Sequence, residues 1–377
     1  MNRRERLMAT LKGDAVDRPP VSFYEINGLD ENPNDPDPFN IYNHPSWEPL
    51  IRLAKDHTDR IVMRVVSFLN IPPDPIRELT VTNTWIENGS TYTQKTIQAG
   101  KRLLTQTTRR DAGVNTIWQV EHLLKNLDDL IAFLELPWPE PGGIPDIHGV
   151  LNAEASLGDT GIVMIDTGDP ICAAAALFNL GTYTVLATTE PAWFHRLLEL
   201  FAKELFYRTQ VISTALPGRL WRIYGPEYAS PPYLHPRLFR EYVTVYDREM
   251  VTMVQSNGGF ARIHSHGRLR LILDEIRATE CTALDPIEPP PQGDVELEYV
   301  RATYGEQMVL FGNLEASDLE NLATNLFEQK IRKAIREGTS GKGRGFVLMP
   351  SSCPYGRELP DLALRNYQKM IEVIETG

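Results

Sequence analysis

The sequence has 377 residues, of which 42% are hydrophobic and 23% are charged, and its formal net charge is -12. This composition is typical of a globular protein with a large core. The acidic balance, without runs of like charge, argues against binding to nucleic acid or to an anionic membrane, and no apolar stretch is long enough to span a bilayer. Because the three cysteines lie far apart, we expect no disulfide scaffold and a cytoplasmic location.

Strand-like and helix-like segments alternate along most of the chain. An amphipathic helix is predicted over 4–11, and a strand over 21–25 follows a Pro-Pro pair. Repeated strand–helix units favour a single α/β domain over 1–377, folded as a (β/α)8 TIM barrel, and an open doubly wound sheet is the alternative. The further predicted strands lie at 60–66, 161–166, 220–225, 260–264, 282–287, 308–313 and 345–350.

The segment 80–120 breaks this alternation. Its Thr-rich stretches are strand-like, and turn signals separate them at 88–89, 99–100 and 111–113. This pattern predicts a meander of β-hairpins inserted after the second strand. Two roles stay open for the insertion, namely covering the barrel mouth and mediating contacts in a homodimer.

A pair of histidines provides the sharpest local feature. His264 and His266 are two residues apart at the end of a predicted strand, so their side chains project from the same face. Cys353 follows the last predicted strand, which ends at the same rim of a barrel. Two imidazoles and one thiolate match a catalytic zinc site with one open position, so we predict zinc on these three residues. The alternative is two histidines bonded to backbone carbonyls and a packed thiol.

Carboxylates follow two further predicted strands in proline-rich loops, which hold side chains rigidly. Glu227 follows the fourth strand, and Asp285 and Glu288 follow the sixth. We predict a catalytic role for these three residues as acids, bases or additional ligands, and helix capping is the alternative. No GxGxxG or GxxxxGK pattern occurs, so a nucleotide cofactor is not expected. Glu25, Asp166 and Tyr228 are the predicted substrate contacts.

The sequence at 4–20, Arg-Glu-Arg-Leu-Met-Ala-Thr-Leu-Lys-Gly-Asp-Ala-Val-Asp-Arg-Pro-Pro, resembles the opening of the uroporphyrinogen decarboxylase superfamily. Later segments resemble it in the same order, so the similarity covers nearly the whole chain. The resemblance implies a (β/α)8 barrel that is either a decarboxylase or a corrinoid-linked methyltransferase, such as methylcobamide:coenzyme M methyltransferase. The later matching segments are Gly225 with 230–232, Phe239-Arg-Glu-Tyr-Val, His264-x-His266-Gly, Asp285 and Gly312-Asn313.

Two departures indicate the branch. Decarboxylases of this superfamily carry an Arg-Gln-Ala-Gly-Arg motif, whereas this chain has Val-Ser-Phe-Tyr-Glu at 21–25, so decarboxylation of uroporphyrinogen is not expected. The methyltransferases carry a His-x-Cys-Gly motif and a distant cysteine, which bind zinc. His264 and Cys353 match these positions, but His266 stands where that branch has cysteine. Zinc on this set would be a stronger Lewis acid, suited to polarising an ether or alcohol oxygen.

The resemblance therefore implies a zinc-assisted methyltransferase. It would move a methyl group between a small methoxylated or methylated substrate and a corrinoid protein. The cobalamin is expected on that partner, because this chain lacks the Asp-x-His-x-x-Gly motif of cobalamin-binding domains. The alternatives are a lyase that resembles uroporphyrinogen decarboxylase and a barrel that binds a small ligand without catalysis.

Overall fold

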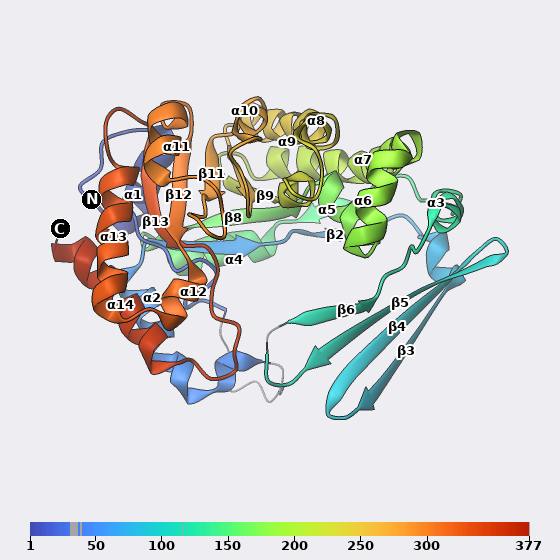
Figure 1. Cartoon of the computed structure of the whole chain (residues 1–377), viewed down its shortest axis with the longest axis horizontal. Helices are drawn as coiled ribbons and strands as arrows, with labels where there is room; N and C mark the ends of the chain where they lie inside the picture. The colour runs from blue at the N-terminus through green and yellow to red at the C-terminus, as the bar shows by residue number, and fades with distance from the viewer. Residues whose placement is uncertain (31–36, 38–39, 115, 377) are drawn as a thin grey trace.

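The computed structural model describes residues 1–30, 37, 40–114 and 116–376 (Figure 1). Its main sheet has seven strands, all parallel and hydrogen-bonded in the order in which they occur along the chain. Because this order never reverses, the doubly wound alternative is excluded and the α/β class is confirmed. The strands are β1 (Arg60–Arg64), β8 (Gly161–Gly168), β9 (Leu220–Tyr224), β10 (Phe260–Ser265), β11 (Ala283–Pro286), β12 (Val309–Leu314) and β13 (Phe346–Pro350).

The two edges of this sheet approach a single segment of the chain. Val21 forms a parallel bridge with Leu348 in β13, and its carbonyl accepts a hydrogen bond of 2.7 Å from the backbone nitrogen of Asp59, next to β1. The sheet is therefore curled. Of the strand predicted over 21–25, only Val21 forms a β-bridge in the described structure, and residues 22–25 are not in a strand. Tyr24, with φ of 57°, takes the backbone out of the extended conformation.

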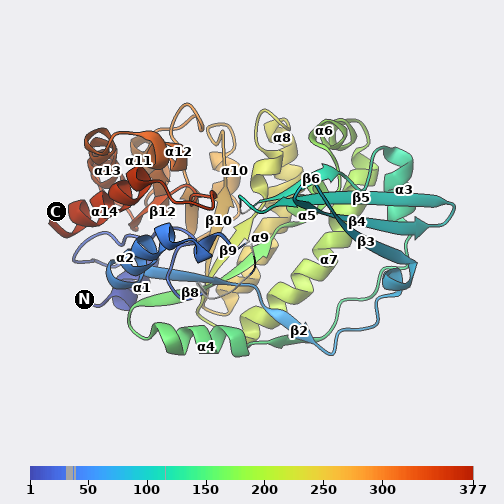
Figure 2. The ribbon, with the colours of Figure 1, turned by 90° about the horizontal axis from the view of Figure 1, so that it is seen from below.

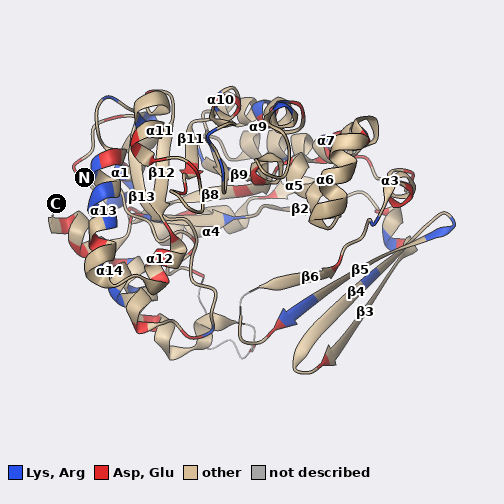
Figure 3. Cartoon of the chain, in the orientation of Figure 1, with Lys and Arg blue, Asp and Glu red and all other residues tan. Residues whose placement is uncertain are grey.

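Helices follow most of the strands, as Figures 1 and 2 show. None of the helices in the described ranges is long and apolar enough to cross a membrane. In Figure 3, basic and acidic residues are interspersed along α13 (Thr324–Gly338) and α14 (Asp361–Thr376). The helices outside the insertion are α1 (Arg3–Lys12), α2 (Glu48–His57), α4 (His148–Leu157), α5 (Pro170–Ala175), α6 (Leu180–Thr189), α7 (Pro191–Ala215), α8 (Pro236–Phe239), α9 (Val245–Ser256), α10 (Leu273–Arg277), α11 (Leu297–Tyr304), α12 (Ala316–Asn321), α13 (Thr324–Gly338) and α14 (Asp361–Thr376).

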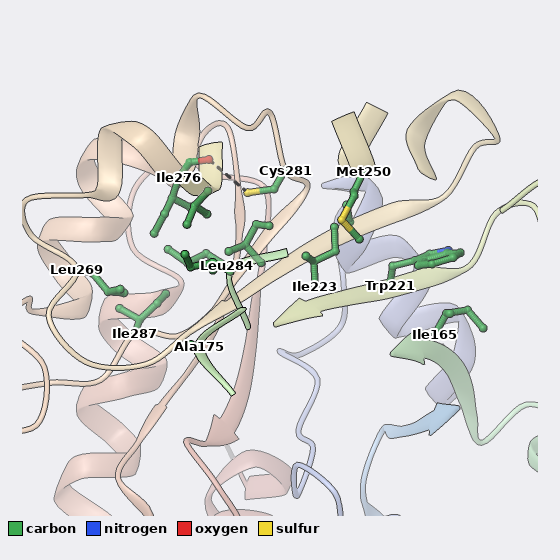
Figure 4. Close-up of a cluster of buried hydrophobic side chains, with 14 of the residues drawn as sticks. Ile165, Ala175, Trp221, Ile223, Met250, Leu269, Ile276, Cys281, Leu284 and Ile287 are labelled. Carbon is green, nitrogen blue, oxygen red and sulfur yellow. Dashed lines mark hydrogen bonds between the residues drawn. The ribbon is translucent and has the colours of Figure 1, made fainter. Parts of the chain in front are cut away.

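Alternation along the strands gives the sheet two faces of different chemistry. On the outer face, Trp221, Ile223 and Leu284 belong to the same buried cluster as Met250 of α9 (Figure 4). On the inner face, apolar residues of the strands form a second cluster with Leu7 and Leu11 of α1. Further along the strands, the inner face becomes polar, because side chains two residues apart point the same way. The polar inner-face residues are Asp166, Arg222, Arg262, His264 and Asp285.

The strands β3 (Thr80–Glu87), β4 (Ser90–Ala99), β5 (Arg102–Asp111) and β6 (Ile117–Glu121) form a separate antiparallel sheet, the meander, which projects away from the parallel strands (Figure 1). After β5, Val114 bridges Gly356 in the loop after β13, and the carbonyl of Gly113 accepts a hydrogen bond of 3.0 Å from the backbone nitrogen of Arg357. At the other end the chain leaves and returns through β2 (Ser67–Leu69) and β7 (Ile144–Asp146), which pair with each other. The helix α3 (Leu127–Leu134) follows the meander.

Candidate active site

His264 and Asp285 form a buried pair on neighbouring strands. They are opposite each other in the register of β10 and β11, and Nδ1 of His264 lies 2.8 Å from Oδ2 of Asp285. Burial alone would raise the pKa of Asp285, but the charges of Arg262 and Arg222 and the contact with His264 outweigh it and lower this pKa to about 2. Asp285 is therefore an anion that only accepts hydrogen bonds. The proton of a neutral His264 then resides on Nδ1, and its Nε2 is an acceptor.

Arg262 neutralises the second oxygen of Asp285. It lies two residues before His264 on the same face of β10, and its Nε is 3.0 Å from Oδ1 of Asp285. The two atoms are not aligned as a hydrogen bond, so this contact is an ion pair. Both carboxylate oxygens of Asp285 thus face a cationic or proton-bearing group, as a buried charge requires.

Arg222 extends the pair into a network across the inner face. Its Nε and Nη2 donate to the two oxygens of Asp166 at 2.6 and 3.1 Å, and its Nη1 donates to the hydroxyl of Tyr24 at 2.6 Å. The Tyr24 hydroxyl lies 3.4 Å from Nε2 of His264. Because burial raises the pKa of Tyr24, this hydroxyl keeps its proton and faces the histidine as a donor. We call Tyr24, Asp166, Arg222, Arg262, His264 and Asp285 the inner-face network.

His266 lies beside His264 but in a wetter environment. The two rings are perpendicular, with centroids 4.6 Å apart. Nδ1 of His266 lies 2.8 Å from Oε1 of Glu288, whose Oε2 accepts a hydrogen bond of 2.6 Å from the backbone nitrogen of Gly267. Burial would lower the pKa of His266, but the hydrogen bond and the charge of Glu288 outweigh it and raise this pKa. With its side chain 35% exposed, His266 can be reached by incoming molecules, and its raised pKa favours the imidazolium form.

The predicted zinc ligands are only partly brought together. His264 and His266 are adjacent, and each has its Nδ1 against a carboxylate, as histidines bound to zinc usually do. Cys353 instead lies 3.6 Å from Oε2 of Glu25, and burial raises the pKa of its thiol. Within the described residues, no group of three His, Cys, Asp or Glu side chains is placed to hold a metal ion. The three predicted ligands therefore do not fit a zinc site in this arrangement.

Glu227 belongs to a second group of carboxylates, which we call the acid cluster, with Asp169 and Asp247. Asp169 and Asp247 are fully buried. Burial, and then the charges of Asp247 and Glu227, raise the pKa of Asp169 well above its usual value, and burial with the charge of Glu227 does the same for Asp247. Both are therefore held as neutral acids.

The predicted substrate contacts are in three different places. Asp166 has both oxygens engaged by Arg222, and Glu25 lies against the thiol of Cys353. Tyr228 follows Glu227 in the short 3-10 helix η4 (Pro226–Ala229) and lines a cavity beside the meander.

Three members of the inner-face network, Tyr24, Arg222 and Arg262, are not among the site residues predicted from the sequence. The two arginines could have been found from the sequence. Each is a charged residue within an otherwise apolar strand, at one of the alternating positions that face the inside of the sheet. Tyr24 had no such signal, because its position depends on how the chain leaves the bridge at Val21.

Residues 157–376 match the uroporphyrinogen decarboxylase (URO-D) family, which is more than half of the chain. The chain belongs to the uroporphyrinogen decarboxylase family. The match includes β8 to β13 and all of the inner-face network except Tyr24. Among curated proteins, none matches this sequence. Among solved structures, D-psicose 3-epimerase with D-tagatose from Clostridium cellulolyticum H10 aligns with 60% of this chain and 81% of its own length, at 10% identity and a TM-score of 0.34.

Proposed function

We propose that this family member is a methyltransferase, which transfers a methyl group from a small methoxylated compound to the cobalamin of a separate corrinoid protein. The observation that carries the proposal is the adjacent pair of histidines in different environments. His264 is buried and fixed by Asp285, whereas His266 is reachable and has its pKa raised by Glu288. In such a pair, the reachable group can act as a general acid, and the buried group can position its partner.

His266 is the general acid in this scheme. When the bond between the methyl carbon and the substrate oxygen breaks, that oxygen gains negative charge and needs a proton. Nε2 of His266 donates the proton, and solvent restores it afterwards through the exposed side of the ring. The corrinoid, as co-substrate, supplies the nucleophile that accepts the methyl group. Glu288 stabilises the protonated ring and orients it.

His264 and Tyr24 position the group that reacts. Asp285 fixes the Nδ1–H tautomer of His264, and the Tyr24 hydroxyl, held by Arg222, faces its Nε2. These contacts hold the side chains of His264 and Tyr24 beside His266 in one geometry. Efficient proton transfer requires such a fixed geometry. Zinc on His264, His266 and Cys353 stays a prediction, and no step depends on it.

The arginines favour methyl transfer over the lyase alternative. A decarboxylase needs free cations to hold the carboxylates of its substrate. Arg222 is already paired with Asp166, and Arg262 with Asp285.

We also propose that the segment at Val21 acts as the eighth strand of a (β/α)8 barrel, since both edges of the sheet bond to it.

The test is methyl transfer to free cob(I)alamin from 2-methoxyphenol and other methoxylated compounds, followed by the change in cobalamin absorbance. We expect activity in the wild type and a loss of at least about 100-fold in His266→Gln, the usual minimum for removing a general acid. His148→Gln is the matched control, because Nδ1 of His148 also pairs with a carboxylate, Asp146 at 2.7 Å, but on the exposed surface. Equal losses in both variants, or no transfer by the wild type from any of these donors, would overturn the proposal.

A further inference from the structure

The meander has a long edge strand that is paired on one side only. β3 (Thr80–Glu87) pairs with β4, and no strand in the described ranges pairs with its other side. β3 lies at the outer edge of the meander in Figure 1, and residues 81–89 are all exposed. Among them, Val81 is 59% exposed and Ile86 is 77% exposed. A long exposed edge strand of this kind is a template for pairing with another strand.

The free side of β3 presents backbone donors and acceptors at every second residue. Asn88 and Gly89, with φ of 52° and 79°, form the two-residue turn that joins β3 to β4. The residue pair that flanks such a turn is hydrogen-bonded, and hydrogen-bonded pairs alternate with non-hydrogen-bonded pairs along the ladder. The N–H and C=O groups of Thr82, Thr84 and Ile86 therefore point away from β4. No backbone group from another part of the described chain bonds to them.

β3 lacks the features that usually prevent edge pairing. Natural edge strands are short, or they contain proline, lysine or a β-bulge. The eight residues of β3, Thr-Val-Thr-Asn-Thr-Trp-Ile-Glu, include neither proline nor lysine, and their register with β4 is regular throughout. The other edge strand of the meander, β6, is shorter, and its register with β5 shifts between Thr107 and Thr108. Of these two edges, the one at β3 is therefore the suitable one for pairing.

The charge of the edge favours a second copy of the chain as the partner. The formal net charge of -12 makes most contacts between two copies repulsive. β3 has one charged residue, Glu87, at its end, so antiparallel pairing of two copies places the two glutamates at opposite ends of the contact. A strand that pairs antiparallel with itself forms the self-complementary patch that a two-fold dimer requires. The first seven residues of β3 carry no charge that would select an acidic or a basic partner strand instead.

A row of aromatic and arginine side chains crosses the meander to this edge. Trp85 of β3 is 39% exposed and stacks on Tyr92 of β4, with ring centroids 5.4 Å apart and planes 10° apart. Tyr92 is opposite Arg109 in the register of β4 and β5, and Arg109 is opposite Trp118 of β6. Tyrosine, tryptophan and arginine are enriched in the centres of protein interfaces. Pairing at β3 would bring the rows of two copies together on one face of the combined sheet.

We propose that the protein is a two-fold symmetric homodimer in which the β3 strands of two copies pair antiparallel about Thr84. This pairing joins two four-stranded meanders into one continuous sheet. Trp85 then lies opposite Asn83 of the second copy and diagonal to the second Trp85, within reach of an aromatic contact. Both β3 edges are used in the contact, so assembly stops at two copies. The inference does not depend on the proposed methyl transfer.

Sedimentation equilibrium of the full chain tests the association. We expect a dimer with a Kd of about 10 μM or tighter. Thr84→Pro removes the N–H groups at the centre of the interface, and proline is tolerated where the N–H of an edge strand points outward, so the hairpin should form and dimerisation should weaken at least about 10-fold. Thr84→Val is the matched control, because it keeps the N–H and should dimerise as the wild type does. Circular dichroism verifies the fold of each variant.

Three results would overturn the proposal. These are a wild type that stays monomeric at all concentrations, assemblies larger than a dimer, and equal dimerisation by a folded Thr84→Pro protein.

Disulfide cross-linking tests the register and does not depend on the proline variant. The two Cα atoms at position 84 should be about 5.5 Å apart, within the range of a disulfide. Thr93 is the neighbour of Thr84 on β4, and the two copies of position 93 should be about 14 Å apart, three strand spacings. Under mild oxidation, Thr84→Cys should form a covalent dimer on a non-reducing gel, and Thr93→Cys should not exceed the background of the wild type, which has three cysteines. Equal cross-linking of the two variants, or none in Thr84→Cys, would show that β3 is not the interface.

Discussion

Asp285 and Asp247 are equally buried, yet they are in opposite protonation states. Each side chain has no exposed surface. Asp285 lies between Arg262 and His264 and has a lowered pKa of about 2, whereas Asp247 interacts with the negative charge of Glu227 and has a raised pKa. Burial raises the pKa of both carboxyls, so the sign of the neighbouring charge decides the outcome. The inner-face network is therefore a set of paired charges, whereas in the acid cluster burial and the charge of Glu227 favour the neutral form of Asp169 and Asp247.

The strongest test of this comparison is Asp285→Ala. It leaves Arg262 as a buried cation without its counter-ion and removes the partner of His264. We expect a loss of about 3–5 kcal/mol in the free energy of unfolding, measured in urea, because breaking a buried pair leaves an uncompensated charge. Asp247→Asn, which replaces one neutral buried group with another of similar size, should change stability by less than about 1 kcal/mol near pH 4. Similar losses in both variants would contradict the assigned protonation states.

A second test uses the pH dependence of stability. Asp247 has a folded pKa above the ordinary value of 3.8, so folding carries no ionisation cost for it below pH 3.8. As the pH rises, the unfolded chain loses this proton first, and stability falls until the folded pKa is reached. Asp247→Asn does not titrate. It should therefore gain stability relative to the wild type between pH 4 and 7, with a slope of at most about 1.4 kcal/mol per pH unit.

The contribution of Asp285 to stability should change with pH in the opposite direction. Its lowered pKa stabilises the fold above pH 3.8, and this contribution is lost as the pH falls towards about 2. The control for Asp247→Asn is Asp14→Asn at an exposed position, which should show no such slope relative to the wild type. A flat difference between the wild type and Asp247→Asn from pH 4 to 7 would show that Asp247 is charged in the folded protein.

A third test concerns the contrast between the two histidines. Glu288→Gln removes the charge that raises the pKa of His266 but leaves a side chain of the same shape. The alkaline limb of the pH–rate profile should move to lower pH, because the imidazolium then loses its proton more easily. The rate of methyl transfer at neutral pH should fall about 10-fold, which corresponds to one hydrogen bond to a charged group. A lower rate with an unmoved profile would indicate a structural role for Glu288 only.

The features of the fold and of the site that depend on local sequence pattern could be predicted from the sequence. Most strand positions, the parallel α/β class and the adjacency of His264 and His266 follow from periodicity along single strands. The contacts of Asp285 with His264 and of Arg222 with Tyr24 depend on the register between strands and on the backbone turn at Tyr24. The neutral state of Asp247 depends on burial beside Glu227, a residue 20 positions away in the sequence. None of these follows from the spacing of residues along the chain.

The smallest effect is expected for Cys353→Ser. In the described structure, the thiol lies against Glu25, and its raised pKa keeps it protonated rather than as the thiolate that zinc requires. A serine hydroxyl can donate to the same carboxylate, so stability should change by less than about 1 kcal/mol and methyl transfer by less than about twofold. Elemental analysis of both proteins after purification with added zinc completes the test. If the wild type holds one zinc ion per chain, and Cys353→Ser loses both metal and activity, then His264, His266 and Cys353 do converge. In that case the ligand set predicted from the sequence is correct, and the placement of Cys353 beside Glu25 is not the one that functions.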